Sequence, residues 1–82
     1  MEYRLTEHAR DALAKRQIAE EWMVQTLTAP EWTEPDPVDE ELEHRLAHIA
    51  QFGNRVLRVI VNVRVQPVRV VTTYFDRRRK DR

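Results

Sequence analysis

The stretch RVLRVIVNVRVQ, residues 55–66, alternates aliphatic residues with residues of mixed character along its whole length. Such residues favour extended backbone, and successive side chains of a strand point to opposite faces of a sheet. One predicted face is wholly apolar and consists of Leu57, Val59, Val61, Val63 and Val65. The other face is mixed and consists of Val56, Arg58, Ile60, Asn62 and Arg64. We expect the apolar face to meet the rest of the fold and the mixed face to be open to solvent or a ligand.

Two more strands are predicted, one on each side of this stretch. Residues 68–75 follow the break at Pro67 and are rich in valine, threonine and aromatic residues, which favour strands. Residues 42–52, LEHRLAHIAQF, precede a turn at Gly53 and Asn54. They alternate well enough for a strand, although the pattern alone does not exclude a helix. Together the three stretches predict antiparallel strands over about 42–75.

A hairpin of two short helices is predicted before the strands, over about residues 6–28. Thr6 is a suitable N-cap for the first helix, and the apolar residues that follow it recur at helical spacing. The second helix is expected from Ala19 to Thr28. Pro30 ends it, because proline cannot continue a helix.

The remaining segments connect or extend these elements. Residues 30–41 are rich in proline and acid and predict an extended crossing segment, with a short edge strand around residues 32–34. Residues 76–82 predict a basic tail. The whole chain, 1–82, is therefore expected to be one α+β domain, in which two N-terminal helices pack on an antiparallel sheet of three to four strands.

The composition excludes several kinds of active site. The chain has no cysteine and no serine, so thiol catalysis, thiolate metal sites and serine-triad hydrolysis are excluded. The single glycine, Gly53, excludes a glycine-rich phosphate loop. No apolar run approaches the roughly 20 residues that span a membrane, and the N-terminus lacks a signal-peptide core. We therefore expect a cytoplasmic protein that does not enter a membrane.

The formal charge is zero overall but is divided between the two halves. Residues 1–41 carry eleven acidic and four basic residues, which gives −7, and residues 42–82 carry three and ten, which gives +7. A basic half built on strands can present a positive surface to phosphate. The alternative is that the two halves neutralise each other within the folded domain.

Four stretches of the chain together resemble a known family. They are HARDALAKRQI from residue 8, EHRLAHI from 43, GNRVLRVIVN from 53 and RVVTTYFDRR from 69. Over nearly the whole chain they are similar to the small bacterial domain-of-unknown-function family 4258. Such domains are regarded as distant relatives of the RelE-like and BrnT-like toxins, which are small metal-independent ribonucleases with two N-terminal helices on an antiparallel sheet. The resemblance implies this RelE-like fold and a toxin ribonuclease that acts on RNA.

The resemblance also implies which residues form a site. Carried over position by position, it falls on His8, Arg16, Arg45, Thr72 and Tyr74. Two positions depart from the family pattern. Ala12 stands where members often have an arginine, which weakens phosphate binding on the first helix, and Gln17 stands where the usual glycine lies between the helices.

Metal-free RNA cleavage needs a base, a cation and an acid, and the hypothesis assigns these catalytic roles to His8, Arg45 and Tyr74. His8 lies near the positive end of a helix, which favours the neutral imidazole that can act as an acid or base. Tyr74 can donate a proton or stack on a base. Arginine matches phosphate oxygens with its planar fork. The expected phosphate- or nucleic-acid-binding residues are Arg16, Arg58, Arg64 and Thr72.

Each assignment has a structural alternative. His8 is then an exposed residue at a helix start, and Arg16 ties the first helix to the second. Arg45 binds phosphate only if it shares the mixed face with Arg58, and otherwise it forms an ion pair with the acidic segment 39–43. Tyr74 is then an ordinary cross-strand neighbour.

No metal or other cofactor is expected. His44 and His48 lie side by side only on a helix, whereas on a strand four residues span roughly 13 Å. The competing function is a non-catalytic module whose basic sheet face binds nucleic acid or protein. The expected partners are RNA or an acidic antitoxin protein, and the expected state is a monomer or homodimer.

Overall fold

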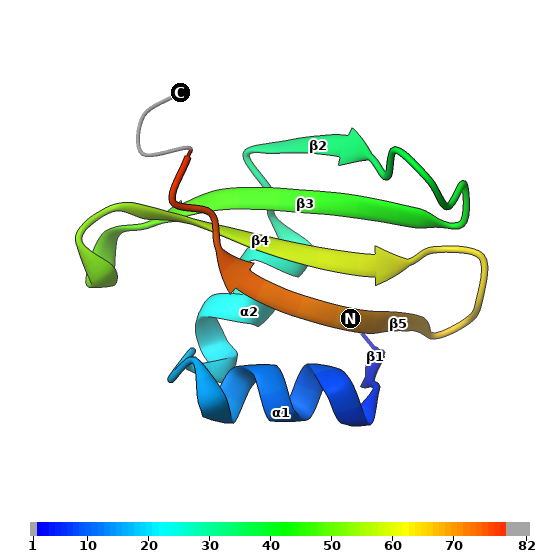
Figure 1. Cartoon of the computed structure of the whole chain (residues 1–82), viewed down its shortest axis with the longest axis horizontal. Helices are drawn as coiled ribbons and strands as arrows, with labels where there is room; N and C mark the ends of the chain where they lie inside the picture. Colours follow the sequence, from blue (N-terminus) through cyan, green and yellow to red (C-terminus); the bar gives the residue numbers. More distant parts are fainter. Residues whose placement is uncertain (1, 79–82) are drawn as a thin grey trace.

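The computed structural model describes residues 2–78 and forms one mixed sheet with two helices (Figure 1). The strands lie side by side in the order β1-β5-β4-β3-β2. In chain order the elements are β1 (Tyr3–Leu5), α1 (Glu7–Lys15), α2 (Glu20–Thr28), β2 (Trp32–Pro35), β3 (Leu42–Ile49), the 3-10 turn η1 (Ala50–Phe52), β4 (Arg55–Asn62) and β5 (Val68–Phe75). The predicted α+β class with two N-terminal helices is confirmed.

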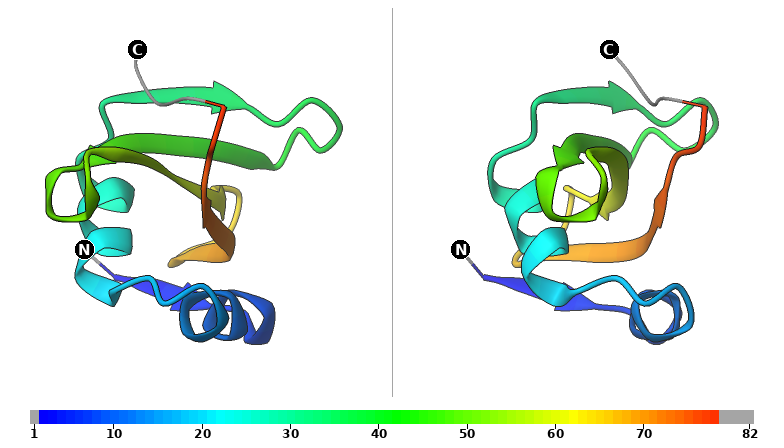
Figure 2. Two further views of the ribbon diagram at one scale, coloured as in Figure 1. Left: turned by 60° about the vertical axis from the view of Figure 1, so that its left-hand side comes forward. Right: turned by 90° about the vertical axis from the view of Figure 1, so that its left-hand side faces the viewer.

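The apolar face of β4 meets the helices, as predicted. Leu57, Val59 and Val61 are fully buried in one core with Met23 and Leu27 of α2. Both helices lie against this side of the twisted sheet (Figure 2). We call the opposite side the open face. The strand is shorter than predicted, because it ends at Asn62, so that Val63, Arg64 and Val65 lie in the connection to β5.

Strand β1 was not predicted, and it makes the sheet mixed rather than antiparallel. It pairs parallel with β5, so that Tyr3 lies opposite Val68 and Arg4 opposite Arg69. Three residues are too few to show an alternating pattern, and the partner strand is at the other end of the chain. The first and last strands therefore become neighbours only in the folded state.

Two segments whose secondary structure the sequence left undecided are strands. Residues 42–49 form a strand, and Ala50–Phe52 turn as η1 before Gly53 and Asn54, which both have positive φ. The edge strand expected around residues 32–34 is β2, which pairs antiparallel with β3. None of the helices within residues 2–78 is long and apolar enough to cross a membrane.

Thr6 caps α1 and also ties it to the sheet. Its hydroxyl oxygen accepts a hydrogen bond from the backbone N–H of Ala9 at 3.0 Å and its hydroxyl donates to the carbonyl of Val71 at 3.1 Å. The predicted N-cap is confirmed, and Ala9 and Ala12 form the buried side of the helix. The same residue fixes where α1 begins and how it sits on β5.

Gln17 follows the end of α1 and stands where the resemblance implies a glycine. Gln17 has φ of 54°, in the left-handed region. Its N–H donates to Ala14 and the N–H of Ile18 donates to Leu13, the two bonds of a Schellman motif. Non-glycine residues are strained in this conformation.

A Gln17→Gly variant is therefore expected to raise the free energy of unfolding by about 0.5–1 kcal/mol, since glycine removes this strain at some entropic cost. Urea unfolding followed by tryptophan fluorescence measures the change. Gln25→Gly, inside α2, is the matched control and should lower stability by about 1 kcal/mol. A destabilised Gln17→Gly variant would contradict the explanation.

Candidate functional site

A buried arginine organises the open face of the sheet. Arg58 is only 6% exposed, although the sequence places it on the mixed face that we expected to be open. Its Nη2 and Nε donate to Oδ2 of Asp76 at 2.6 and 3.2 Å, and its Nη1 donates to Oε1 of Glu34 at 3.1 Å. Nη1 also donates to Nδ1 of His44 at 2.7 Å. One guanidinium thus joins β2, β3, β4 and the residue that follows β5.

These contacts fix the protonation state of His44. A guanidinium has donors only, so Nδ1 of His44 must accept and carries no proton. Nε2 therefore holds the proton and donates to Oδ1 of Asp36 at 2.6 Å. Both nitrogens of His44 are thus occupied, one by the guanidinium of Arg58 and the other by the carboxylate of Asp36.

Asp36 is held in its ionised form. The backbone N–H of Asp39, the His44 side chain and the backbone N–H of Val38 all donate to its carboxylate. These bonds, with that of Asp39 the strongest influence, lower the pKa of Asp36 to about 2. The same carboxylate therefore shapes the β2–β3 connection and orients the imidazole.

The charge of this cluster does not suit a phosphate ligand. Arg58 binds two carboxylates, those of Glu34 and Asp76, and a third, that of Asp36, is linked to it through His44. Burial is the largest influence on Asp76 and raises its pKa, but the hydrogen bonds from Arg58 and from the backbone N–H of Arg78, with the charges of both arginines, together leave the pKa below its ordinary value. The four contacts of Arg58 use four of its five N–H donors. Arg58 is therefore not the open residue that we expected, and its assignment as a phosphate ligand stays a prediction.

Tyr74 is the one predicted catalytic residue that the structure brings beside Arg58. The two residues face each other across β4 and β5. Together they line a depression on the open face with Glu34, Asp36, His44 and Asp76. The three carboxylates that line it already have hydrogen-bond partners.

Arg45 lies on the opposite side of the sheet. Its Nη1 donates to the carbonyl of Leu27 near the end of α2 at 2.8 Å, and its Nε donates to Glu43 at 2.7 Å. The condition for phosphate binding, a shared face with Arg58, is not met. The alternative ion pair with the acidic segment is the arrangement observed, and it also satisfies a carbonyl near the C-terminus of a helix.

The other predicted site residues do not gather around Tyr74. His8 and Arg16 are exposed on α1 and at its C-terminal cap, on the helix side of the sheet. Thr72 lies on the open face opposite Ile60, and Arg64 is exposed in the β4–β5 connection. His8 and Tyr74 are thus separated by the sheet.

The two histidines of β3 each bind a carboxylate. His48 lies 2.8 Å from Oε1 of Glu31, as His44 lies beside Asp36. They share one face of the strand, four residues apart. Within residues 2–78 no group of three histidine, aspartate or glutamate side chains is placed to hold a metal ion.

An aromatic cluster that sequence reasoning missed lies where β4 begins and β5 ends. We call Trp22, Phe52 and Phe75 the aromatic shelf. The ring centroids of Phe52 and Phe75 are 4.8 Å apart, and that of Trp22 is 5.5 Å from Phe52. Phe52 is 40% exposed, whereas the other two pack against the core. The position of Phe52, just before the Gly53–Asn54 turn, was the available signal.

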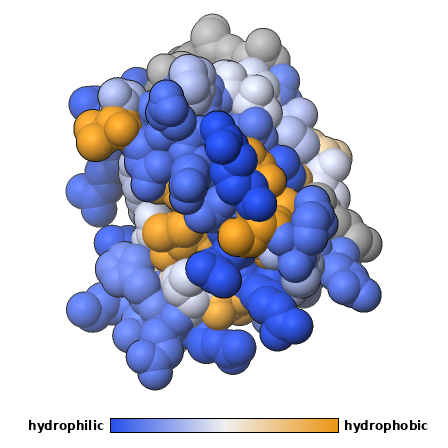
Figure 3. Space-filling view, turned by 90° about the vertical axis from the view of Figure 1, so that its right-hand side faces the viewer, coloured by the Kyte–Doolittle hydropathy of each residue, from blue (hydrophilic) through white to orange (hydrophobic). Residues whose placement is uncertain are grey.

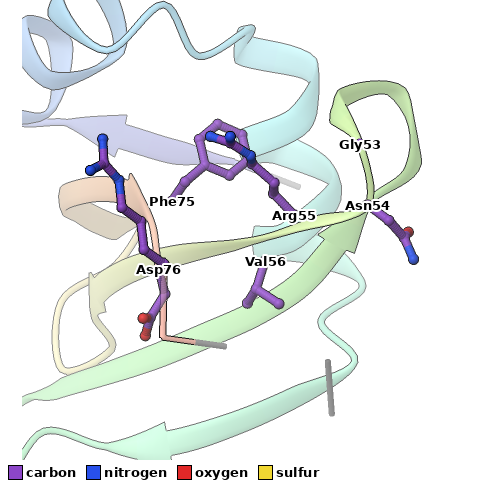
Figure 4. Close-up of a pocket in the computed structure, with 7 residues that line it drawn as sticks. Gly53, Asn54, Arg55, Val56, Phe75 and Asp76 are labelled. Atoms are coloured by element: carbon purple, nitrogen blue, oxygen red, sulfur yellow. The ribbon is translucent and has the colours of Figure 1, made fainter. Parts of the chain in front are cut away.

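Two arginines accompany the aromatic shelf. The guanidinium carbon of Arg55 lies 5.2 Å from the ring centroid of Phe52. Arg55, Phe75 and Arg77 line one depression, and Figure 4 shows the side chain of Arg55 projecting toward the ring of Phe75. Among residues 2–78 neither arginine takes part in an ion pair.

A second basic feature lies at the other end of β5. Arg4 and Arg69 are direct neighbours in the parallel pairing of β1 and β5, and both are exposed. Arg69 also lies opposite Asn62, which places the pair on the open face. In the described part of the chain no carboxylate forms an ion pair with either of them. We call these two residues the arginine pair.

Comparison with known proteins yields one family. The family model described as "Domain of unknown function (DUF4258)" matches residues 5–75. No curated protein and no solved structure matches the chain. The match spans both helices and all strands except part of β1, and it attaches no activity to them.

Proposed function

We propose a function for this chain, which belongs to the DUF4258 family, from its geometry: it is a binding module that holds RNA through the arginine pair. Like charges directly opposite each other on neighbouring strands are destabilising. Arg4 and Arg69 occupy such positions without a carboxylate from residues 2–78 between them. A phosphate backbone would relieve this repulsion, and this is the observation that carries the proposal.

RNA is proposed over an acidic protein because of the spacing of the arginines, since a guanidinium by itself binds carboxylates as well as phosphates. Strand β5 has exposed arginines at both ends: Arg69 lies near its start and Arg77 lies just beyond Phe75. Eight residues of extended chain separate them, a span of roughly 26 Å. A polyanion can reach both ends of the strand.

Figure 3 supports an exposed polar surface near the start of β5. It views the end of the molecule that holds the β4–β5 connection, where hydrophilic residues surround a small hydrophobic group.

The ribonuclease interpretation drawn from the resemblance has less support. It needs an acid, a base and a cation around one scissile bond. His8 and Tyr74 lie on different sides of the sheet, and Arg45 already binds Leu27 and Glu43. We therefore propose binding without cleavage. The kinship with RelE-like and BrnT-like toxins stays a prediction.

The proposal is tested by fluorescence anisotropy with a labelled single-stranded RNA of about twelve nucleotides, at several salt concentrations. The parent is expected to bind at low salt and to release RNA as salt rises. An Arg4→Gln/Arg69→Gln variant should reduce the slope of log affinity against log salt by about 1.4, since each phosphate contact to a single strand contributes about 0.7.

The matched control is Arg10→Gln/Lys15→Gln, which removes the same charge from the exposed side of α1. It should bind nearly as the parent does. Absence of binding at low salt, or equal loss in both double variants, would overturn the proposal. The integrity of the RNA is followed on a gel in the same samples, and cleavage would favour the ribonuclease interpretation instead.

A further inference from the structure

The aromatic shelf exposes an aromatic ring that the core does not require. Trp22 and Phe75 pack against buried residues, but Phe52 remains 40% exposed at the end of η1. Its ring centroid lies 4.8 Å from that of Phe75 with an interplanar angle of 35°, so that neighbouring side chains cover part of the Phe52 ring and the rest is accessible. An exposed aromatic ring offers a flat apolar surface.

The surroundings of the shelf are cationic. Arg55 lies 5.2 Å from the centroid of the Phe52 ring, a distance at which a cation is attracted to the ring. Arg77 lines a depression that Arg55 and Phe75 also line. Asp76 also lines this depression, but its carboxylate is already bound to Arg58. Arg55, Arg77 and the ring of Phe75 therefore line one depression, and the exposed ring of Phe52 lies beside it.

This combination selects among possible ligands. An apolar ligand would cover the rings but would remove two guanidinium groups from water without partners. Inorganic phosphate would satisfy the guanidinium groups but would leave the rings exposed. A nucleotide satisfies both, because its base has a flat face for the ring and its phosphate accepts from arginine.

We propose that Phe52, supported by Phe75, stacks on an unpaired base of single-stranded RNA while Arg55 and Arg77 bind the adjacent phosphate. The proposal rests on the RNA-binding function proposed above and deepens it, because it names the form of the RNA. In a duplex both faces of each internal base are already stacked, so a ring on the protein surface has nothing to cover. The shelf therefore distinguishes single strands from duplexes, whereas the arginine pair does not.

Fluorescence anisotropy tests the base-stacking proposal by comparing binding of a labelled single-stranded RNA of about twelve nucleotides with binding of the duplex of the same sequence. Phe52→Ala is expected to weaken single-strand binding about fivefold to a hundredfold, the range of one base–aromatic stack, and to leave duplex binding unchanged. Phe52→Leu, which keeps an apolar side chain without a ring, should show most of the same loss. Trp22 lies 5.5 Å from Phe52 and its fluorescence should respond to the single strand.

Controls separate this proposal from the function on which it rests. Circular dichroism checks folding, which a substitution at the exposed Phe52 should not disturb. The matched control is Val38→Ala, which removes apolar surface away from the aromatic shelf, since Val38 is 90% exposed. If the parent binds RNA and Phe52→Ala changes nothing, or weakens single strand and duplex equally, the base-stacking proposal is overturned while the binding function stands. If the parent binds neither form, both are overturned.

Discussion

Replacing Arg58 by alanine is expected to lower the free energy of unfolding by about 3–5 kcal/mol, the usual cost of removing one partner from a buried ion pair. The variant would leave the carboxylate of Asp76, 4% exposed, without its main donor. Nδ1 of His44 and Oε1 of Glu34 would lose the same guanidinium. Small domains are stable by only about 5–15 kcal/mol, so a substantial unfolded fraction is expected at room temperature.

Urea unfolding followed by tryptophan fluorescence measures this loss. Arg58→Lys keeps a charge but not the planar fork, so an intermediate loss is expected. Arg64→Ala is the matched control on an exposed arginine and should change stability by less than about 0.5 kcal/mol. A double-mutant cycle of Arg58→Met and Asp76→Asn should show a coupling energy above about 1 kcal/mol. Additive losses would mean that the two side chains act independently.

The features that sequence reasoning predicted depend on local pattern. The alternation in β4 placed Leu57, Val59 and Val61 on the core side, and the cap at Thr6 fixed the start of α1. Both signals lie within a few residues, because side-chain period and capping chemistry are properties of neighbouring positions. Local pattern was therefore sufficient for most elements of the fold.

The features that it missed depend on contacts between distant positions. Arg58 lies on the mixed face as predicted, but three side chains from other elements bury it: Glu34, His44 and Asp76. Asp76 had been assigned to a basic tail, and Glu34 to the acidic crossing segment. No spacing in the sequence indicates that these two carboxylates bind the same arginine. The alternative that the two halves neutralise each other is borne out at the Glu34–Arg58 pair.

The candidate site in the structure differs from the predicted one for the same reason. Arg45 of β3 pairs with Val59 of β4, the residue next to Arg58, so Arg45 and Arg58 lie on opposite faces of the sheet. The candidate site instead uses four exposed arginines that lie at strand ends and edges, namely Arg4, Arg55, Arg69 and Arg77. Exposure at such places depends on where strands stop and which strand pairs with which. The composition of a strand indicates neither where it ends nor which strand it pairs with.

Acidification from pH 5 to pH 2 is expected to unfold the domain. Asp36 has a folded pKa of about 2, below the ordinary value of 3.8, and the folded pKa of Asp76 is also lowered. A carboxylate with a depressed pKa contributes stability above its ordinary pKa and loses it as the pH falls toward its folded pKa. Over this window the unfolded chain binds up to about two more protons than the folded chain, so protons drive unfolding.

Circular dichroism between pH 7 and pH 2 follows this transition, and urea unfolding at each pH gives its slope. Asp36→Asn should be less stable than the parent at pH 7 and less sensitive to acid, because one titrating group is gone. Asp11→Asn, on the exposed side of α1, is the matched control and should keep the acid transition of the parent. A stability that stays level between pH 5 and pH 2 would mean that the cluster around Arg58 does not hold its carboxylates in the ionised form, and the charge argument against phosphate at Arg58 would lose its basis.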